Sequence, residues 1–494
     1  MSEDFDLYDL LGLPRDAGPE EIRRAYHQAA RRLHPDVNTK PGETELFLRA
    51  QEAYEILSNP EKRSEYDAQL PPDEEKTAPV TLDILYSRSS LSALAEPQLM
   101  YALLELSAPS TGSSPTPEAR PALNLSIVLD RSTSMKGERM DMVKAAAQNL
   151  LNQLRPDDFF SLIVFSDRAE TLISAGRQKN LKEISSQIRM IQTGGGTEIF
   201  QGLDLGLREV RRNLSNNFIN HILLLTDGRT YGDEEACLEA ASQAATDGIG
   251  ITCLGIGEEW NDKFLDELSA RTGGSSDYVS NATDIKNILQ KKFHHLSQTY
   301  AEQVELEIHC GSGVDLGYVY RVAPEPSPLP VASPIHLGNL PREDQLAVLI
   351  EFLVLPLPSQ GTHSDLATGQ LSMNIPAKIP SNLSMQIDFS RPVGGNSWKE
   401  SAPAKLLRAA SQVSLYRLQE KVQVEVAGGQ VEQASQHLLY LATQLLSQGN
   451  RDLAQTALLE VDHLNHTRTF SSTGEKQIKY GTRSLMLPAG SESD

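Results

Sequence analysis

The pattern of apolar positions divides the chain into several kinds of segment. Near the N-terminus, apolar residues recur at helical spacing over 19–33 and 44–58, which predicts two amphipathic helices packed as an antiparallel hairpin. Apolar runs that end in polar residues alternate with helical patterns over 122–298, which predicts a mostly parallel sheet covered on both faces. Short strands separated by Pro, Gly and Ser turns occupy 301–395, and helical spacing returns over 403–467.

A chain of 494 residues is too long for a single hydrophobic core, so these patterns predict a multidomain protein. The predicted order is an all-α hairpin at 1–70, a linker at 71–79, strands at 80–108 that join a later β-sandwich, an α/β doubly wound domain at 122–298, the rest of the sandwich at 301–395, helical hairpins at 403–467 and a mobile tail at 468–494. The α/β domain is therefore expected to be inserted into the sandwich. For the C-terminal helices we favour a packing bundle over a separate peptide groove of the tetratricopeptide kind, since one unit is too few to define a repeat.

Charge and composition exclude some functions. The formal net charge of −21 argues against nonspecific nucleic-acid binding, which requires a basic face. The longest apolar stretch, 346–357, contains Glu351 and Pro356 and is too short to span a bilayer. The acidic N-terminus lacks the order of a secretory signal, and the three widely spaced cysteines are predicted to be buried in a reducing compartment. We therefore expect a cytoplasmic protein without a membrane span.

A short polar motif, His34-Pro35-Asp36, directly follows the first predicted helix. Because Pro35 disfavours helical geometry at His34, the tripeptide is expected at the tip of the hairpin. The basic residues of the helix lie largely off its apolar stripe: Arg23, Arg24, Arg31 and Arg32.

These features resemble the J-domain of DnaJ-type co-chaperones. The segments YDLLGLP, FLRAQEAYEILSNP and EKRSEYD flank the tripeptide in register with that family across its four helices. The resemblance implies that the arginines dock on an acidic patch of a DnaK-type chaperone and that His34, Pro35 and Asp36 stimulate its ATP hydrolysis. The alternative is an ordinary turn beside a solvated helix face, which the flanking segments disfavour. Neither a Gly/Phe-rich linker nor CxxCxGxG repeats follow, so client choice is expected to come from the rest of the chain.

Candidate metal ligands follow two buried strands of the α/β domain. Asp130-Arg131-Ser132-Thr133-Ser134 ends the strand at 123–130, Asp227 ends the strand HILLLT, and Thr197 lies in a glycine loop between them. Ligands of such sheets bind beyond the carboxyl ends of the strands. Serines after a strand also cap helices, so the DxSxS segment alone is weak, whereas the complete set in this order favours a metal site.

The set is similar to the metal-ion-dependent adhesion site of von Willebrand factor A domains. The resemblance implies that Ser132, Ser134 and Thr197 offer hydroxyl oxygens to the metal, while Asp130 and Asp227 act mainly through water. Small oxygen ligands with water suit Mg²⁺, with Mn²⁺ or Ca²⁺ as alternatives. Bacterial proteins related to calcium-activated chloride channel regulators resemble the whole arrangement, with the metal domain inserted into a β-sandwich.

Two kinds of enzyme are disfavoured by the same residues. An aspartyl-phosphate phosphatase would need a second Asp at Ser132, and a P-loop NTPase would need Gly-Lys-Ser/Thr where Thr197-Glu198 follows the glycine loop. We therefore expect a non-enzymatic bacterial adaptor with a DnaK-type partner and a protein ligand that offers an Asp or Glu carboxylate to the metal. The main alternative is a scaffold subunit of a MoxR-type AAA+ ATPase complex, and a hydrolase is a weaker third hypothesis.

Overall fold

The structure, a computed structural model, describes residues 7–8, 18, 22–26, 30, 50–51, 53–59, 62–63, 66, 80–109, 120–177, 180–230, 232–357, 363–376, 381–394 and 401–486. The chain divides into two compact units, Met1–Pro79 and Val80–Asp494. Among the described residues, no helix combines the length and the hydropathy that crossing a membrane requires.

The N-terminal unit has a small helical core in its described part. Residues 22–26 and 53–57 are helical, and Ile22, Ala53 and Leu57 are buried together with Tyr8 and Ala50. The rings of Tyr26 and Tyr54 stack across the two helices with centroids 4.3 Å apart. The apolar faces thus pack against each other as the sequence predicts, because neither could be buried alone.

The predicted site residues of this unit are only partly described. Arg23 and Arg24 are exposed on the first helix, opposite its buried residue Ile22. The other predicted positions lie outside the described residues: Arg31, Arg32, His34, Pro35, Asp36 and the linker at 71–79.

The central domain of the second unit is built on a mixed, mostly parallel sheet. Its described strands are, in spatial order, β5 (Ala169–Arg177), β4 (Phe159–Phe165), β3 (Ala122–Asp130), β6 (Phe218–Thr226), β7 (Gly250–Ile256) and β8 (Ser276–Val279). Only β5 among them runs antiparallel to its neighbour. Strands β3 and β6 are buried at every residue but the first because helices cover both faces of the sheet.

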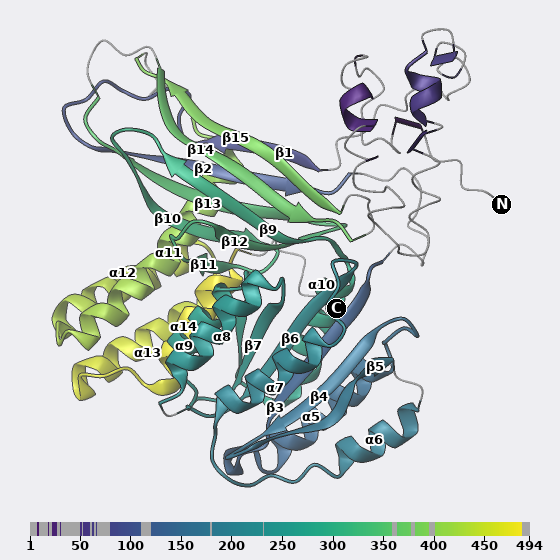
Figure 1. Ribbon diagram of the computed structural model, residues 1–494. Helices are drawn as coiled ribbons and strands as arrows, with labels where there is room; N and C mark the ends of the chain where they lie inside the picture. Colours follow the sequence, from purple (N-terminus) through teal and green to yellow (C-terminus); the bar gives the residue numbers. More distant parts are fainter. Residues whose placement is uncertain are drawn as a thin grey trace. The chain divides into compact units, whose positions relative to one another are not determined.

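Helices cover the two faces in two groups (Figure 1). One face packs against α5 (Glu138–Leu151), α6 (Leu181–Arg189) and α10 (Ile285–Ser297). The other face packs against α7 (Ile199–Arg211), α8 (Glu234–Thr246) and α9 (Asp262–Ala270). Short 3-10 turns occur at η2 (Thr133–Met135) and η3 (Ala282–Asp284). This doubly wound arrangement confirms the predicted fold class.

Two antiparallel sheets form a sandwich around the apolar side chains that face each other. The first contains β1 (Thr81–Tyr86), β2 (Gln98–Ser107), β13 (Gln345–Val354), β10 (Val314–Ala323) and β11 (Ser327–Leu329). The second contains β12 (Ile335–Pro341), β9 (Thr299–Cys310), β14 (His363–Asn374) and β15 (Asn382–Pro392). Between them the rings of Phe352 and Phe389 lie 5.6 Å apart.

The α/β domain is inserted into this sandwich, as predicted. Strand β2 pairs with β13 over ten residue pairs, from Gln98 opposite Val354 to Ser107 opposite Gln345. Because the α/β domain lies in the chain between β2 and β9, both of its ends return to the sandwich. The buried guanidinium of Arg321 on β10 fastens this junction by donating to the carbonyls of Gly273 at 2.5 Å and Gly274 at 2.6 Å.

A C-terminal bundle packs against the outer face of the first sheet. Its described helices are α11 (Ala404–Ala427), α12 (Val431–Ser447), α13 (Arg451–Thr467) and α14 (Ser472–Ser484). On α11, Leu406, Val413 and Tyr416 form a buried cluster with Tyr320 and Leu349 of the sheet. A packed bundle, which the sequence analysis favoured, is therefore what the C-terminal helices form.

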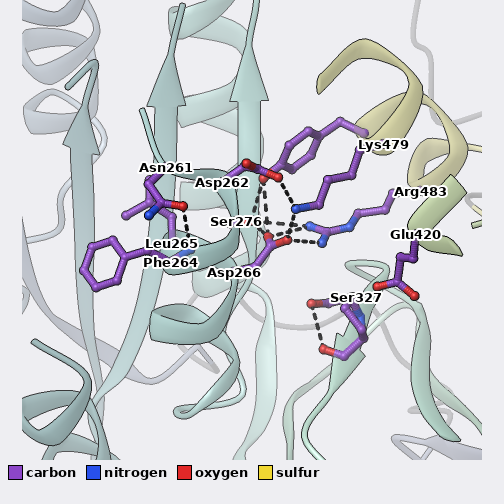
Figure 2. Close-up of polar contacts among 12 residues, drawn as sticks. Asn261, Asp262, Phe264, Leu265, Asp266, Ser276, Ser327, Glu420, Lys479 and Arg483 are labelled. Atoms are coloured by element: carbon purple, nitrogen blue, oxygen red, sulfur yellow. Dashed lines mark hydrogen bonds and ion pairs between the residues drawn. The ribbon is translucent and has the colours of Figure 1, made fainter. Parts of the chain in front are cut away.

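The prediction of a mobile tail from residue 468 was wrong for α14. This helix is held against α9 by ion pairs, which Figure 2 shows. Lys479 pairs with Asp262 and lies 2.7 Å from Asp266, and Arg483 lies 2.5 Å from Asp266. The basic pattern of the segment suggested exposure, but its cations are buried because acidic partners more than 200 residues away neutralise them.

The prediction that all three cysteines are buried was also partly wrong. Cys237 and Cys253 are buried in the α/β domain, whereas Cys310 at the end of β9 is exposed. Burial alternates along β9 only as far as Ile308, and the last two residues of the strand, His309 and Cys310, are both exposed because they lie beyond the sandwich core.

We predict that a chain beginning at residue 120 has a less stable sandwich. Removing β1 and β2 exposes the edge of β13 and removes buried residues such as Leu104 and Leu106 from the core. Thermal unfolding followed by circular dichroism should show a lowered Tm relative to the full chain. An unchanged Tm for the truncated chain would contradict the shared sandwich.

A second prediction concerns Asp266→Asn, which leaves Lys479 and Arg483 without this charge. Removing one partner of a buried ion pair costs about 3–5 kcal/mol. Burial alone would raise the pKa of Asp266, but Arg483 and Lys479 outweigh that effect and hold the pKa well below its usual range. The wild-type advantage should therefore be complete above about pH 4, the usual pKa of Asp, and shrink as the pH falls below it.

Urea unfolding at several pH values measures this difference. Asp204→Asn is the matched control, because Asp204 pairs with Arg208 at the surface of α7 and such pairs contribute about 1 kcal/mol or less. Equal losses for both variants would contradict a structural role for the buried network.

Candidate metal centre

The candidate site lies at the carboxyl ends of two adjacent parallel strands. Asp130 is the last residue of β3, and Asp227 directly follows β6. Strands β3 and β6 are hydrogen-bonded neighbours, with Leu129 opposite Leu225. The parallel register therefore brings the two carboxylates to one edge of the sheet, although 97 positions separate them in the sequence.

Hydrogen bonds connect four of the five predicted ligands. The Asp130 carboxylate accepts from the backbone N–H of Ser132 at 2.7 Å, through Oδ1. The hydroxyls of Ser132 and Ser134 lie 2.9 Å apart, and Ser134 donates to Asp227 Oδ1 at 2.7 Å. The result is a hydrogen-bonded chain that runs from one aspartate to the other, with the backbone N–H of Ser132 as its first link.

Thr197, the fifth predicted residue, lies beside this chain at Gly228. A Cβ atom added to Gly228 would lie 2.7 Å from Thr197 Oγ1, so the two residues are in close contact. Any larger residue at 228 would displace the hydroxyl. The glycine after Asp227 therefore keeps space for Thr197 at the site.

The glycine loop is fastened to the DxSxS segment mainly through its backbone. Gly194 donates its N–H to the carbonyl of Arg131 at 2.8 Å. The carbonyl of Gly195 accepts from the backbone N–H of Thr133 at 3.1 Å and from its hydroxyl at 3.0 Å. Gly195 has a φ of +87°, which favours glycine. Thr133 thus joins the DxSxS segment to the glycine loop. Its hydroxyl bonds Gly195 and not the serine and aspartate side chains of the site.

Burial divides the site into two layers. Asp130 and Asp227 are almost completely buried, whereas Ser134 is exposed and Thr197 is half-buried. Burial raises the pKa of Asp130 to about 6, against the lowering effect of the hydrogen bonds from Thr226 and Ser132. Ser132 is buried as well, so buried carboxylates beneath the exposed Ser134 form a site that a cation would stabilise from the solvent side.

Three residues of this arrangement were missed by the sequence analysis. Thr226 donates its hydroxyl to Asp130 Oδ2 at 2.6 Å, and Arg139 donates to Asp227 Oδ2 at 2.6 Å. Gly228 makes room for Thr197. Thr226 and Gly228 flank Asp227 in the sequence, so the motif itself could have indicated them. Arg139 lies nine positions after Asp130, and only the fold shows that it reaches Asp227.

A loop beside the site connects it with the C-terminal bundle. Arg139 lies against Gly257, since a Cβ added there would be 2.6 Å from its Nη2. Lys476 of α14 donates to the carbonyls of Glu258 and, at 2.8 Å, of Trp260. The 257–260 loop is therefore held between the candidate metal centre and α14.

Other polar clusters offer less. A cavity of about 290 Å³ lies between the α/β domain and the sandwich and is lined by Lys292, Glu325 and His221, among others. Lys292 lies 2.6 Å from Glu325 and 2.5 Å from Asp277, so this cation of the cavity is already paired with carboxylates of the protein. Among the described residues, no group of three His, Cys, Asp or Glu side chains is placed to hold a metal ion. The hydroxyl-rich site at the strand ends is thus the stronger candidate.

Comparison with known families defines the class of the protein. Residues 6–67 match the DnaJ domain, and residues 124–293 match the von Willebrand factor type A domain. Residues 404–488 match the Sll0103-like C-terminal alpha-helical domain. The chain therefore combines a J domain of the DnaJ type with a von Willebrand factor A domain and a C-terminal helical domain, as the sequence analysis expected for the first two.

Two curated relatives match different parts of the chain. "Uncharacterized protein sll0103" of Synechocystis sp. is 29% identical over 289 residues, which are 55% of this chain and 68% of that protein. "Chaperone protein DnaJ" of Methanosarcina thermophila is 49% identical over 67 residues, 14% of this chain and 17% of that protein. The chain thus spans about a sixth of the DnaJ protein, in the J domain.

Solved structures share the fold beyond the J domain. The chain is similar to a von Willebrand factor type A protein from Catenulispora acidiphila with a TM-score of 0.65 at 15% identity, covering 83% of this chain and 98% of that one. The ArnB paralog VWA2 from Sulfolobus acidocaldarius gives a TM-score of 0.52 at 16% identity, with 83% and 100% covered. At these identities the likeness concerns the fold alone.

Proposed function

We propose that this protein is a cytoplasmic, non-enzymatic co-chaperone adaptor. Its J domain stimulates the ATPase of a DnaK-type chaperone, and its A domain holds a protein partner through Mg²⁺. The observation that carries the proposal is the hydrogen-bonded chain from Asp130 through Ser132 and Ser134 to Asp227, in a polypeptide that also has a J domain. Both modules are of types that are typically non-enzymatic.

The donor set of the A domain fits a hard divalent cation. Ser132, Ser134 and Thr197 would offer neutral hydroxyl oxygens, and Asp130 and Asp227 would hold those hydroxyls and the bound water. Mg²⁺ prefers oxygen ligands and keeps several waters, which suits a site with few protein ligands and one open side. Mn²⁺ has similar preferences, and Ca²⁺ would require more ligands.

An exchangeable water position would then accept a group from a partner. Because Ser134 is exposed and Thr197 is half-buried, an ion held by these residues would lie near the surface, within reach of a partner's side chain. A hard cation favours an anionic oxygen, so the contact would be an Asp or Glu carboxylate. The J domain would bring the chaperone to whatever the A domain holds.

The J-domain part rests on sequence identity and on the helical core. The 49% identity to a DnaJ protein extends over 67 residues, about the length of this domain, and the family implies a DnaK-type partner. Arg23 and Arg24 are exposed on the first helix, on the face that would contact an acidic surface of the partner. His34, Pro35 and Asp36 would carry the stimulation.

We predict that Ser134→Ala weakens Mn²⁺ binding to the full chain by about 10-fold or more, because it removes one direct ligand and the hydrogen bond to Asp227. Electron paramagnetic resonance of free Mn²⁺ during a titration measures the affinity. Thr133→Ala is the matched control, since its hydroxyl lies in the same segment but bonds Gly195. Equal affinities for the wild type and Ser134→Ala would contradict the assigned ligands.

A separate prediction tests the chaperone partner. The full chain should raise the steady-state ATPase rate of a bacterial DnaK-type protein, and His34→Gln should abolish most of that increase. Stimulation should also fall with added salt, because exposed charges are screened within about 8–10 Å at physiological ionic strength. His466→Gln, at an exposed histidine of the C-terminal bundle, is the control. Full stimulation by His34→Gln would overturn the assignment.

A further inference from the structure

We propose that Arg139 adjusts the charge of the metal site so that the loaded site retains an anionic partner group. In this role Arg139 is a positioning residue that weakens the hold on the cation and strengthens the hold on a carboxylate. The inference rests on the proposed function. It adds Arg139 as a residue that favours an anionic over a neutral partner group at the metal-loaded site.

The first step is that Arg139 and a metal ion are compatible. Arg139, the second residue of α5, contacts Asp227 through Oδ2, whereas Ser134 donates to Oδ1 of the same carboxylate. The two oxygens therefore have separate partners. Because Ser134 uses its hydrogen for Asp227, Ser132 donates in the contact between the two serine hydroxyls, and one lone pair of Ser134 remains available to a cation. Arg139 does not have to leave when the ion binds.

The second step is the charge of the hydrogen-bonded group. Asp130 and Asp227 are carboxylates, Arg139 is a guanidinium, and the three hydroxyl ligands are neutral. Their formal sum is one negative charge, so a divalent cation turns it into one net positive charge. Without Arg139 the loaded group would be formally neutral. Arg139 therefore opposes the metal by repulsion and leaves the loaded site attractive to an anion.

The third step is that Arg139 is held in place and remains accessible. Its guanidinium lies against Gly257, and the carbonyl of Glu259 in the same loop accepts from Arg229 Nε at 2.8 Å. Lys476 of α14 holds the loop from the other side through the carbonyls of Glu258 and Trp260. The side chain of Arg139 is nevertheless 39% exposed, so a partner's carboxylate on the ion could also approach it.

The test measures two affinities of the full chain, for Mn²⁺ and for acetate on the Mn²⁺-loaded site. Water-proton relaxation by bound Mn²⁺ reports both, since acetate displaces a metal-bound water, and acetamide is the neutral control probe. We expect Arg139→Gln to bind Mn²⁺ more tightly, by an amount on the order of tenfold, and to bind acetate more weakly. Arg139→Lys keeps the charge and should preserve the wild-type balance.

The outcomes separate this inference from the function on which it rests. Tighter Mn²⁺ binding together with weaker acetate binding by Arg139→Gln supports the inference, provided that circular dichroism and Tm show a folded variant. The reverse pair of changes overturns it. Weaker binding of both probes would assign Arg139 a purely structural role, and unchanged affinities would give it none, so either result overturns the inference. A wild-type chain that does not bind Mn²⁺ would overturn the proposed metal function and this inference with it.

Discussion

The burial of two carboxylates at adjacent strand ends is the constraint on which the site depends. Asp130 and Asp227 lie side by side at the edge of a sheet whose interior is apolar, and their charges must be compensated there. Hydroxyls, backbone N–H groups and Arg139 provide part of that compensation. The glycine loop, the DxSxS segment and the 257–260 loop are arranged around this pair, and Ser134, which donates to Asp227, is exposed to solvent. In the proposed function a cation would provide the remaining compensation from that side.

A second buried charge cluster joins the C-terminal bundle to the same domain. Asp266 of α9 is paired with Lys479 and Arg483 of α14. Lys476, also on α14, holds the loop beside Arg139. Helix α14 thus contacts both the side of the A domain and a loop next to its candidate metal centre. This connection attaches the bundle to the A domain and links Asp227 to α14 through Arg139 and the 257–260 loop.

The combination of modules gives each part a separate task in the proposed adaptor. The J domain forms its own compact unit with a small helical core, so the proposed chaperone contact would not require the A domain. The A domain, in contrast, cannot be separated from the sandwich in the same way, because Arg321 and the pairing of β2 with β13 tie both ends of the insertion to it. Partner selection is therefore expected from the second unit as a whole.

The sequence by itself determined the features that depend on local pattern. Continuous apolar strands such as β3 and β6 indicated a covered parallel sheet, and the order of Asp130, Ser132, Ser134, Thr197 and Asp227 indicated a site at its edge. The segments around His34 indicated the J domain. These signals are short in range or follow a register that parallel strands impose, so they can be read without knowing the tertiary contacts.

Tertiary structure alone decided the features that depend on partners far apart in the sequence. Lys479 and Arg483 belong to a segment whose basic composition suggested an exposed tail, and only packing against α9 supplies the carboxylates that make their burial favourable. Arg139 is an ordinary polar position of a helix until the fold brings it to Asp227. Burial of a charged side chain is favourable only where an opposite charge lies next to it in the fold. A partner that is far away in the sequence cannot be inferred from the local pattern of residues.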